Sequence, residues 1–339
     1  MMLKTRSPSN DGRRPQGSVK QVLIIYGPTQ TGKTSLSIKL AKKYSGELIS
    51  ADSRQVYKGL DIGSGKVGFD DVVEKHTGFW TVNGIRINGF DLANPGNRFT
   101  AADFLQSAES SMIRIIEHKK LPILVGGTGF YIKALLEGIG SIGIPADLKL
   151  RRRLEKLSSG NLYKQLLSID PKRAKSMNQS DRANPRRLIR AIEIAFSNQK
   201  VKITGYRLPT TDYLLIGLTA PNEYLYEKAD EWLEKRIQNG LANEVKGLFK
   251  AGVDARWLES LGLEYRWVTK YLLGQISYDE TLIRLRGDIH SFIRRQKTWF
   301  SKFKNIKLFD ISAADFQISL EKTVNLWYTK ENERRKVPA

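Results

Sequence analysis

Short apolar runs alternate with stretches of helical spacing in the first part of the chain. Residues 22–26 (VLIIY) form an unbroken apolar run that ends at a Gly-Pro pair, which is typical of a buried strand in a parallel sheet. Residues 33–44 carry apolar side chains at helical spacing and predict a helix, with Gly46 as its stop. Runs at 47–51 and 121–125 predict two more strands. Strands alternating with helices, with glycines at strand ends, predict an α/β fold with a doubly wound parallel sheet.

The pattern then changes. After about residue 146 the strand-like runs stop and basic, helix-forming segments replace them, until a strand-like run returns at 211–219 and helical spacing resumes at 221–304. We therefore predict an α/β core interrupted by an inserted helical domain. The expected parts are a disordered basic arm at 1–20, a core made of 21–145 and 205–315, a basic helical insertion at 146–204, and a C-terminal helix or tail at 316–339.

Composition limits the function classes. The chain has 339 residues with 40% hydrophobic and 27% charged side chains, a globular balance. It contains no cysteine and three histidines, which argues against disulfides, Cys-based metal sites and His-rich metal sites. The sequence contains no uncharged apolar run of about 18 residues, so it predicts no membrane-spanning helix. Residues 1–20 lack the apolar segment of a signal peptide. We expect a cytoplasmic protein with no membrane partner.

The charge indicates the kind of partner. The formal net charge is +21, and in residues 149–190 Lys and Arg outnumber Asp and Glu 13 to 3. About half of the basic excess therefore lies in the predicted insertion. A concentration of this size favours binding to nucleic acid or another anionic surface.

Residues 27–34 (GPTQTGKT) fit the phosphate-loop pattern GxxxxGK[ST] after a predicted strand and before a predicted helix. Glycines let the backbone wrap an anion, while consecutive N–H groups and the positive helix end face its oxygens. Lys33 adds a full charge, and the Thr34 hydroxyl can reach Mg²⁺. The sheet is thus expected to resemble that of P-loop NTPases. The predicted phosphate ligands are Gly27, Pro28, Thr29, Gln30, Thr31, Gly32, Lys33 and Thr34.

A phosphate loop does not by itself name a reaction, because it can hold a phosphoryl donor, a switch nucleotide or a diphosphate leaving group. The sequence has no NKxD motif and no convincing strand that ends in a Walker B aspartate, which argues against GTPases and motor ATPases. Asp52 follows the second predicted strand, at the strand ends that face the ligand crevice. It could bind Mg²⁺ or accept a proton, and equally it could cap the N-terminus of a helix.

Five segments in order make the chain resemble the bacterial tRNA dimethylallyltransferases of the isopentenyltransferase family. They are GPTQTGKT, SADSRQVYKGLDIG, LPILVGGTGFYIKALLEG, NPRRLIRAIEI and RRQKTWF, and the resemblance runs from about residue 22 to about residue 303. It implies a P-loop core, an insertion that grips the tRNA anticodon stem-loop, and a channel through the core. It also implies transfer of a dimethylallyl group from dimethylallyl diphosphate to N6 of the adenosine 3′ of the anticodon, assisted by Mg²⁺. We expect a monomer.

The resemblance also assigns roles to residues. Asp52 would be the general base, Thr29 would hydrogen-bond the bridging oxygen of the diphosphate, and Thr34 would bind Mg²⁺ or phosphate. The family positions that touch the extruded nucleotide and its neighbours correspond to Asp52, Ser53, Arg54, Gln55 and Thr128. Without the family, the Gly-Gly pair before Thr128 could equally be a tight turn that allows close packing.

Basic residues outside the core segments allow two interpretations each. Arg186, Arg187 and Arg190 are spaced for one helix face, so they either contact tRNA phosphates, which the local charge favours, or form a solvated surface. At 294–300 (RRQKTWF), core packing of Trp299 and backbone binding by Arg294, Arg295 and Lys297 both stay open.

The sequence departs from the family pattern in a few places. Trp232 stands where the family usually has an arginine thought to bind the diphosphate, and we hypothesise that Arg236, one helical turn later, serves instead. An extra strand-like piece spans 79–87, and the segments at 61–67 (DIGSGKV) and 262–266 (GLEYR) are altered. These changes bear on tRNA choice more than on the reaction.

Three other functions compete with this hypothesis. A P-loop kinase that phosphorylates a small molecule with ATP would leave the basic insertion unexplained. A non-catalytic RNA-binding module would leave Asp52 beside the loop unexplained. An isopentenyltransferase acting on free adenine nucleotide would not need the basic insertion.

Overall fold

The computed structural model describes residues 21–334, except 139, 142–143 and 198–211, and gives only the backbone of 331–334. The predicted arm at 1–20 and the end of the predicted insertion lie outside the described residues. The described chain forms two compact units. The first comprises the chain up to Phe99, Ser107–Gly129 and the residues from 212 onward, and the second comprises Thr100–Gln106 and the residues from 130 to 197.

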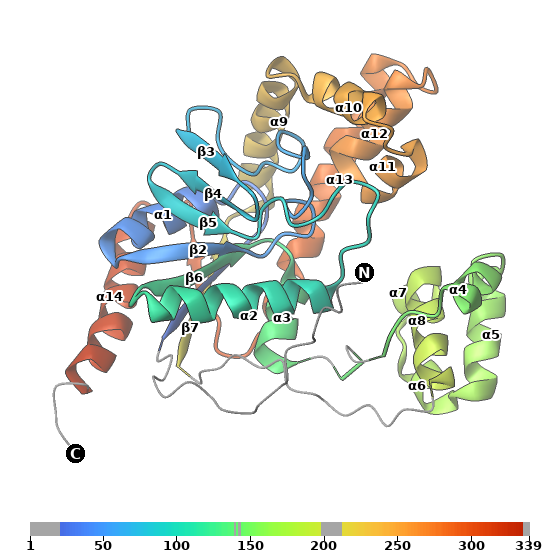
Figure 1. Ribbon diagram of the computed structural model, residues 1–339, viewed down its shortest axis with the longest axis horizontal. Helices are drawn as coiled ribbons and strands as arrows, with labels where there is room; N and C mark the ends of the chain where they lie inside the picture. The colour runs from blue at the N-terminus through green and yellow to red at the C-terminus, as the bar shows by residue number, and fades with distance from the viewer. Residues whose placement is uncertain (1–20, 139, 142–143, 198–211, 335–339) are drawn as a thin grey trace, which may run out of the picture. The chain divides into compact units, whose positions relative to one another are not determined.

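One sheet organises the first unit, in the strand order β3-β4-β5-β2-β6-β1-β7-β8 (Figure 1). The strands from β5 to β8 pair in parallel, which confirms the α/β prediction. Strands β3, β4 and β5 pair antiparallel, so the sheet is mixed and not purely parallel. The strands are β1 (Val22–Tyr26), β2 (Gly46–Ser50), β3 (Val73–His76), β4 (Phe79–Val82), β5 (Ile85–Asn88), β6 (Leu121–Gly126), β7 (Tyr213–Thr219) and β8 (Lys307–Asp310).

The antiparallel edge corrects the single strand-like piece expected at 79–87. Asn83 and Gly84 both have positive φ, at 50° and 79°, and they reverse the chain between β4 and β5. An Asn-Gly pair is a favoured two-residue hairpin turn because its backbone twist matches that of the strands. The turn therefore splits the piece into a hairpin.

Helix α1 (Lys33–Lys43) begins directly after the phosphate loop and packs on the sheet through Ile38, Leu40 and Ala41. The predicted stop at Gly46 is wrong. The residue with positive φ is Ser45, at 51°, and Gly46 already belongs to β2. Glycine is needed there for packing, since a Cβ would lie 2.9 Å from both Ile123 Cδ1 and the Leu121 carbonyl oxygen.

Helices complete the first unit, and all of those below except α2 follow β7. Helices α9 and α13 share an apolar core that includes Leu225, Leu233, Leu285 and Ile289. Helix α14 buries Leu320 and Val324 in the core of the sheet. The helices are α2 (Ala101–Glu117, which both units share), α9 (Asn222–Gln238), α10 (Leu241–Lys250), α11 (Ala255–Leu261), α12 (Leu263–Leu272), α13 (Tyr278–Lys297), the 3₁₀ turn η1 (Phe300–Lys302) and α14 (Phe316–Arg334).

The second unit is helical wherever regular structure is described between residues 130 and 197. Side chains of Asp147, Ser158, Asp170, Asn178 and Asn184 accept backbone N–H groups at the starts of successive helices, which fixes where each begins. A small core of leucine, isoleucine, alanine and methionine joins them. The helices are α3 (Gly129–Glu137), α4 (Leu148–Leu154), α5 (Ser159–Ile169), α6 (Pro171–Ser176), α7 (Gln179–Arg182) and α8 (Pro185–Phe196).

Candidate active site

Three loops meet at one edge of the parallel sheet. In the strand register, Tyr26 at the end of β1 pairs with Gly126 at the end of β6, and Ser50 at the end of β2 pairs with Val125. The loops after β1, β2 and β6 therefore leave the sheet side by side. In open α/β sheets this carboxyl edge is where ligands bind.

The phosphate loop has the backbone that its motif predicts. Gln30 and Gly32 both lie in the left-handed region, with φ of 66° and 68°. Gly27 has no room for a side chain, because a Cβ would lie 2.8 Å from the Leu218 carbonyl oxygen. The Thr31 hydroxyl is buried and donates to the Pro28 carbonyl at 2.9 Å, which braces the loop from inside.

Lys33 is the first residue of α1, and Thr34 is the second. The Lys33 ammonium donates to the Pro28 carbonyl at 2.9 Å. Burial lowers the pKa of Lys33 to about 8, and the nearby Asp52 carboxylate acts in the opposite direction. This effect indicates that Asp52 lies near the phosphate loop at this edge of the sheet. Thr34 is partly exposed.

Asp52 is half-buried in a turn after β2. Its Oδ1 accepts the Arg54 backbone N–H at 2.9 Å. Because no helix follows β2 at this point, the alternative role as a helix N-cap is wrong, and the side chain caps the turn instead. Among the described residues Oδ2 has no hydrogen-bond partner, so one carboxylate oxygen is left for a ligand.

The loop after β6 is bonded to the loop after β2. Thr128 donates its N–H to the Ala51 carbonyl at 3.2 Å, and its hydroxyl accepts the N–H of Ser53 at 3.2 Å. A Cβ on Gly126 would lie 2.2 Å from the Ala51 carbonyl oxygen, so this glycine serves close packing. Thr128 and the exposed Ser53 thus lie together beside Asp52.

The Gln55 amide is held on both sides. Its Oε1 accepts from the Ser50 hydroxyl at 2.6 Å, and its Nε2 donates to the Gly65 carbonyl at 3.0 Å. The second contact fixes Gln55 to the loop at 60–66, which contains the DIG segment.

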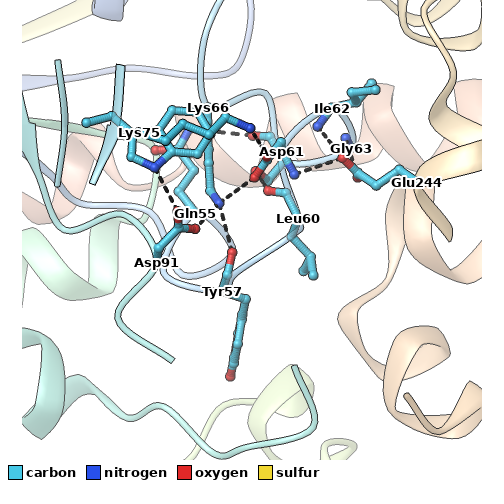
Figure 2. A network of polar contacts seen from close by, with 12 residues as sticks. Gln55, Tyr57, Leu60, Asp61, Ile62, Gly63, Lys66, Lys75, Asp91 and Glu244 are labelled. Atoms are coloured by element: carbon cyan, nitrogen blue, oxygen red, sulfur yellow. Dashed lines mark hydrogen bonds and ion pairs between the residues drawn. The ribbon is translucent and has the colours of Figure 1, made fainter. Parts of the chain in front are cut away.

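Buried polar groups hold that loop in place (Figure 2). The Lys66 ammonium donates to the Tyr57 carbonyl at 2.8 Å, to Asp61 at 2.7 Å and to Asp91 at 2.6 Å, while its side chain has no exposed surface. A buried charge is costly unless paired, and two carboxylates pair this one.

Glu244 supports the same loop from α10. Its carboxylate accepts the N–H groups of Asp61 at 2.9 Å, Ile62 at 2.6 Å and Gly63 at 3.1 Å, and the Tyr265 hydroxyl at 2.8 Å. Sequence reasoning missed this role for Glu244. The sequence shows a glutamate at a fixed distance after Gly240-Leu241. This spacing does not reveal that the partners of the glutamate are backbone amides.

Arg236 is buried, with 8% of its surface exposed, and its Nη1 bonds Glu264 Oε1 at 2.5 Å. Its guanidinium also lies 5.7 Å from the centre of the Trp232 ring, so the two residues share one side of α9 as expected. The second oxygen of Glu264 lies 3.7 Å from Arg54 Nη1, and Arg54 Nη2 donates to the Leu261 carbonyl at 2.5 Å. Two arginines expected to bind different ligands therefore meet at one buried carboxylate.

The three arginines of α8 have different environments. Arg186 is exposed and has no hydrogen-bond or ion-pair partner among the described residues. Arg187 is exposed and paired with Asp181. Arg190 bonds Glu193 at 3.1 Å and the carbonyls of residues 141 and 144 at 2.7 and 2.9 Å, so its guanidinium is occupied by the protein itself.

At the end of α13 the basic side chains also differ. Lys297 donates to the Ala220 carbonyl at 2.9 Å and to Asn222 Oδ1 at 2.8 Å, which makes it a structural residue. Arg294 donates to the Tyr226 hydroxyl at 2.7 Å. Trp299 packs on Gly129, where a Cβ would lie 2.5 Å from the indole, and Arg295 is exposed.

Gln296, between these residues, was missed by sequence reasoning. Its buried amide accepts the Thr29 N–H at 2.9 Å and donates to the Gly127 carbonyl at 3.0 Å. It therefore bonds two of the three loops of the site. The charged and aromatic residues of the RRQKTWF segment suggest a function, whereas the neutral amide of Gln296 gives no comparable sequence signal.

The described residues contain no cluster of three or more His, Cys, Asp or Glu side chains that could hold a metal. No described helix combines the length and the apolar character that crossing a bilayer requires.

Comparisons with known proteins identify the family of the chain. The sequence pattern of the family described as IPP transferase matches residues 55–303. The chain is 35% identical over 283 residues to the tRNA dimethylallyltransferase 1 of Geotalea daltonii, covering 84% of this chain and 87% of that protein. It is 37% identical over 283 residues to the tRNA dimethylallyltransferase 2 of Shewanella sediminis, covering 84% and 89%.

Solved structures give the same result. The tRNA isopentenylpyrophosphate transferase of Bacillus halodurans matches with a TM-score of 0.65 and 32% identity, covering 94% of this chain and 98% of that one. A eukaryotic dimethylallyltransferase acting on tRNA has the same fold, with a TM-score of 0.69 at 23% identity. On these matches, the chain belongs to the IPP transferase family.

Proposed function

We propose that this protein is a tRNA dimethylallyltransferase. It moves the dimethylallyl group of dimethylallyl diphosphate to N6 of the adenosine 3′ of the anticodon and releases diphosphate. The observation that carries the proposal is the Asp52 carboxylate beside the phosphate loop at the carboxyl edge of the sheet, in a chain of this family. The names of the relatives support tRNA as the acceptor and the dimethylallyl group as the group transferred.

The phosphate loop holds the leaving group in this scheme. The allylic C–O bond breaks with its electron pair going to the diphosphate, so the developing negative charge needs fixed positive partners. Lys33, with a pKa of about 8, carries its charge at neutral pH, and the start of α1 adds backbone N–H groups. Thr29 donates its hydroxyl to the bridging oxygen.

Asp52 acts as general base. The N6 nitrogen forms its bond to the allylic carbon and loses one proton, which passes to the free carboxylate oxygen Oδ2. The Arg54 N–H on Oδ1 holds the carboxylate in orientation. A positioned base contributes about 10²–10⁴-fold to a rate. The adenosine must leave its stack to reach this carboxylate, as in other enzymes that modify bases.

A magnesium ion fits the oxygen donors of this site. Mg²⁺ usually takes one or two protein oxygens and completes its shell with substrate phosphates and water. The Thr34 hydroxyl and the diphosphate oxygens would hold it, and it would neutralise part of the diphosphate charge.

We assign candidate tRNA contacts within each unit separately. Ser53, Arg54, Gln55 and Thr128 surround the extruded nucleotide beside Asp52. In the second unit Arg186 is the best-placed phosphate ligand, since it is exposed and uncommitted, while Arg187 must exchange Asp181 for a phosphate. Arg190 contributes by attaching the middle of α8 to the carbonyls of residues 141 and 144. We keep Arg236 as a diphosphate ligand, for which it must give up part of its bond to Glu264.

One assay tests the proposal. The purified protein is incubated with Mg²⁺, labelled dimethylallyl diphosphate and, in parallel, undermodified tRNA, AMP or ATP. We expect label in tRNA at the adenosine 3′ of the anticodon. Label in AMP alone would identify a transferase of free nucleotides, and consumption of ATP without prenyl transfer would identify a kinase. Either result would overturn the proposal.

A further inference from the structure

Gln296 connects two loops of the site through a single buried amide. Only 4% of its surface is exposed. Its Oε1 accepts from the backbone of Thr29, and its Nε2 donates to the carbonyl of Gly127. Because one contact needs an acceptor and the other needs a donor, only one orientation of the amide satisfies both.

The backbone of Gln296 is fixed as well. Its carbonyl accepts the Tyr26 hydroxyl at 2.5 Å, and Tyr26 is the last residue of β1. Burial raises the pKa of Tyr26, so the hydroxyl stays protonated and keeps donating. The next residue, Lys297, is bonded to the Ala220 carbonyl after β7. The end of α13 is therefore attached to the ends of β1, β6 and β7.

These contacts change what the phosphate loop can do. The Thr29 N–H already has a protein acceptor, so it is not one of the amides left for the diphosphate. The bond fixes the backbone that carries the Thr29 hydroxyl. Gly127 leaves the space for this arrangement, since a Cβ there would lie 2.3 Å from Gln296 Nε2.

We infer that Gln296 is a positioning residue for prenyl transfer. It sets the Thr29 end of the phosphate loop at a fixed distance from the loop that carries Thr128, and so aligns the diphosphate with the bound adenosine. The inference rests on the proposed function. Gln296 acts through Thr29 and Gly127 and takes no part in proton transfer.

The first test replaces Gln296 by methionine, which keeps the length of the side chain and removes both hydrogen bonds. Misplacement of reacting groups by about 1 Å can cost about 10²-fold, so we expect kcat to fall about ten- to hundredfold. The Kd of inorganic diphosphate should rise, while the KM for tRNA stays close to that of the wild type. Gln275→Met, at an exposed glutamine, is the matched control and should leave all three unchanged.

The second test is Gln296→Glu, which separates hydrogen bonding from packing. The carboxylate can still accept from Thr29 but cannot donate to the Gly127 carbonyl until it is protonated. Burial raises the pKa of a carboxyl group, so protonation restores the donor as the pH falls. The ratio of the Gln296→Glu rate to the wild-type rate should therefore increase toward low pH. A residue that only fills space would give a flat ratio.

The outcomes are distinct. If the wild type fails to prenylate tRNA, the proposed function is wrong, and diphosphate binding by Gln296→Met still decides whether Gln296 sets the loop. If kcat and diphosphate affinity of Gln296→Met both match the wild type, the inference is wrong. Thermal unfolding of each variant shows whether it folds, and if Gln296→Met does not, the pH ratio of Gln296→Glu decides, a flat ratio overturning the inference.

Discussion

The structure agrees with the residues predicted from a motif in the first unit better than with the residues predicted from charge in the second unit. In the first unit, the GxxxxGK[ST] segment places Lys33 at the start of α1 and near the carboxylate of Asp52. In the second unit, Arg186, Arg187 and Arg190 were grouped by charge and spacing, yet Arg190 is bound to Glu193 and to backbone carbonyls. A motif constrains backbone geometry, whereas a charge pattern does not say which guanidinium the protein uses itself.

The largest effect should come from Asp52→Asn, which tests a residue that was identified by sequence motif. The amide keeps an oxygen for the Arg54 N–H but cannot accept the N6 proton. We expect kcat to fall about 10²–10⁴-fold with the tRNA affinity maintained. Single-turnover transfer and a tRNA binding titration measure the two. Asp70→Asn, at an exposed aspartate, is the control, and a near wild-type rate for Asp52→Asn would remove Asp52 from the base role.

A second prediction concerns Arg236, where motif and charge disagree because Trp232 occupies the family's arginine position. Removing Arg236 alone would leave the buried Glu264 with only the 3.7 Å contact to Arg54, and breaking a buried ion pair costs about 3–5 kcal/mol in stability. The double variant Arg236→Met, Glu264→Met removes both charges and should fold. If Arg236 binds the diphosphate, the Kd of inorganic diphosphate rises about tenfold or more in the double variant, since a hydrogen bond to a charged group contributes about 1.5–3 kcal/mol.

Glu264→Gln serves as the companion to that double variant. It keeps Arg236 while removing the competing charge, so it should bind diphosphate at least as well as the wild type. Unchanged Kd and turnover in the double variant would refute Arg236 as a ligand and make the pair purely structural.

The third prediction uses the titration of Lys33. Its lowered pKa of about 8 means that Lys33 is mostly charged at pH 7 and mostly neutral above pH 9 in the free protein. Diphosphate binding should therefore weaken as the pH rises through 8, by at most about tenfold per pH unit. Because diphosphate itself titrates, the measured quantity is the ratio of Kd values for wild type and Lys33→Met. A ratio independent of pH between 7 and 9.5 would contradict the role of Lys33.

The lowered pKa of Lys33 also determines the direction in which this residue changes the free energy of unfolding with pH. Its folded-state pKa lies below the ordinary value of 10.5, so between about pH 8 and 10.5 the unfolded chain binds more protons at this site than the folded protein. This group alone therefore makes the free energy of unfolding rise with pH across that window. The Lys33→Met variant should lack the increment in denaturant titrations at the two ends of the window.

The sequence was sufficient for the elements whose chemistry is local. Apolar runs predict β1, β6 and β7, since a strand buried on both faces needs nothing else. The strand-like segment 47–51 predicts β2, although it contains Glu47 and Ser50. The hairpin of β4 and β5 and the end of α1 depend on two short turns, at Asn83-Gly84 and at Ser45, which give a much weaker signal than an apolar run.

The contacts that support the site could not be predicted from the sequence, for a different reason. Gln296 and Glu244 act on residues that lie far from them in the sequence, through amides and carbonyls that every residue possesses. Lys66 fits a local motif, but its two carboxylate partners become apparent only when the chain folds. Long-range bonds to backbone groups leave no pattern in side-chain spacing.

The smallest effect is expected from a comparison of Arg186 with Arg190, which tests the residues predicted from charge and spacing. If Arg186 neutralises a tRNA phosphate, Arg186→Gln should lower the slope of log K against log salt by about 0.7–0.9 and leave thermal stability unchanged. Arg190→Gln should do the reverse: it removes bonds to Glu193 and to the carbonyls of residues 141 and 144, so it lowers the unfolding temperature while the salt slope holds. Equal loss of slope in both variants would mean that Arg190 exchanges its protein partners for phosphate, and that charge and spacing alone had identified the tRNA surface correctly.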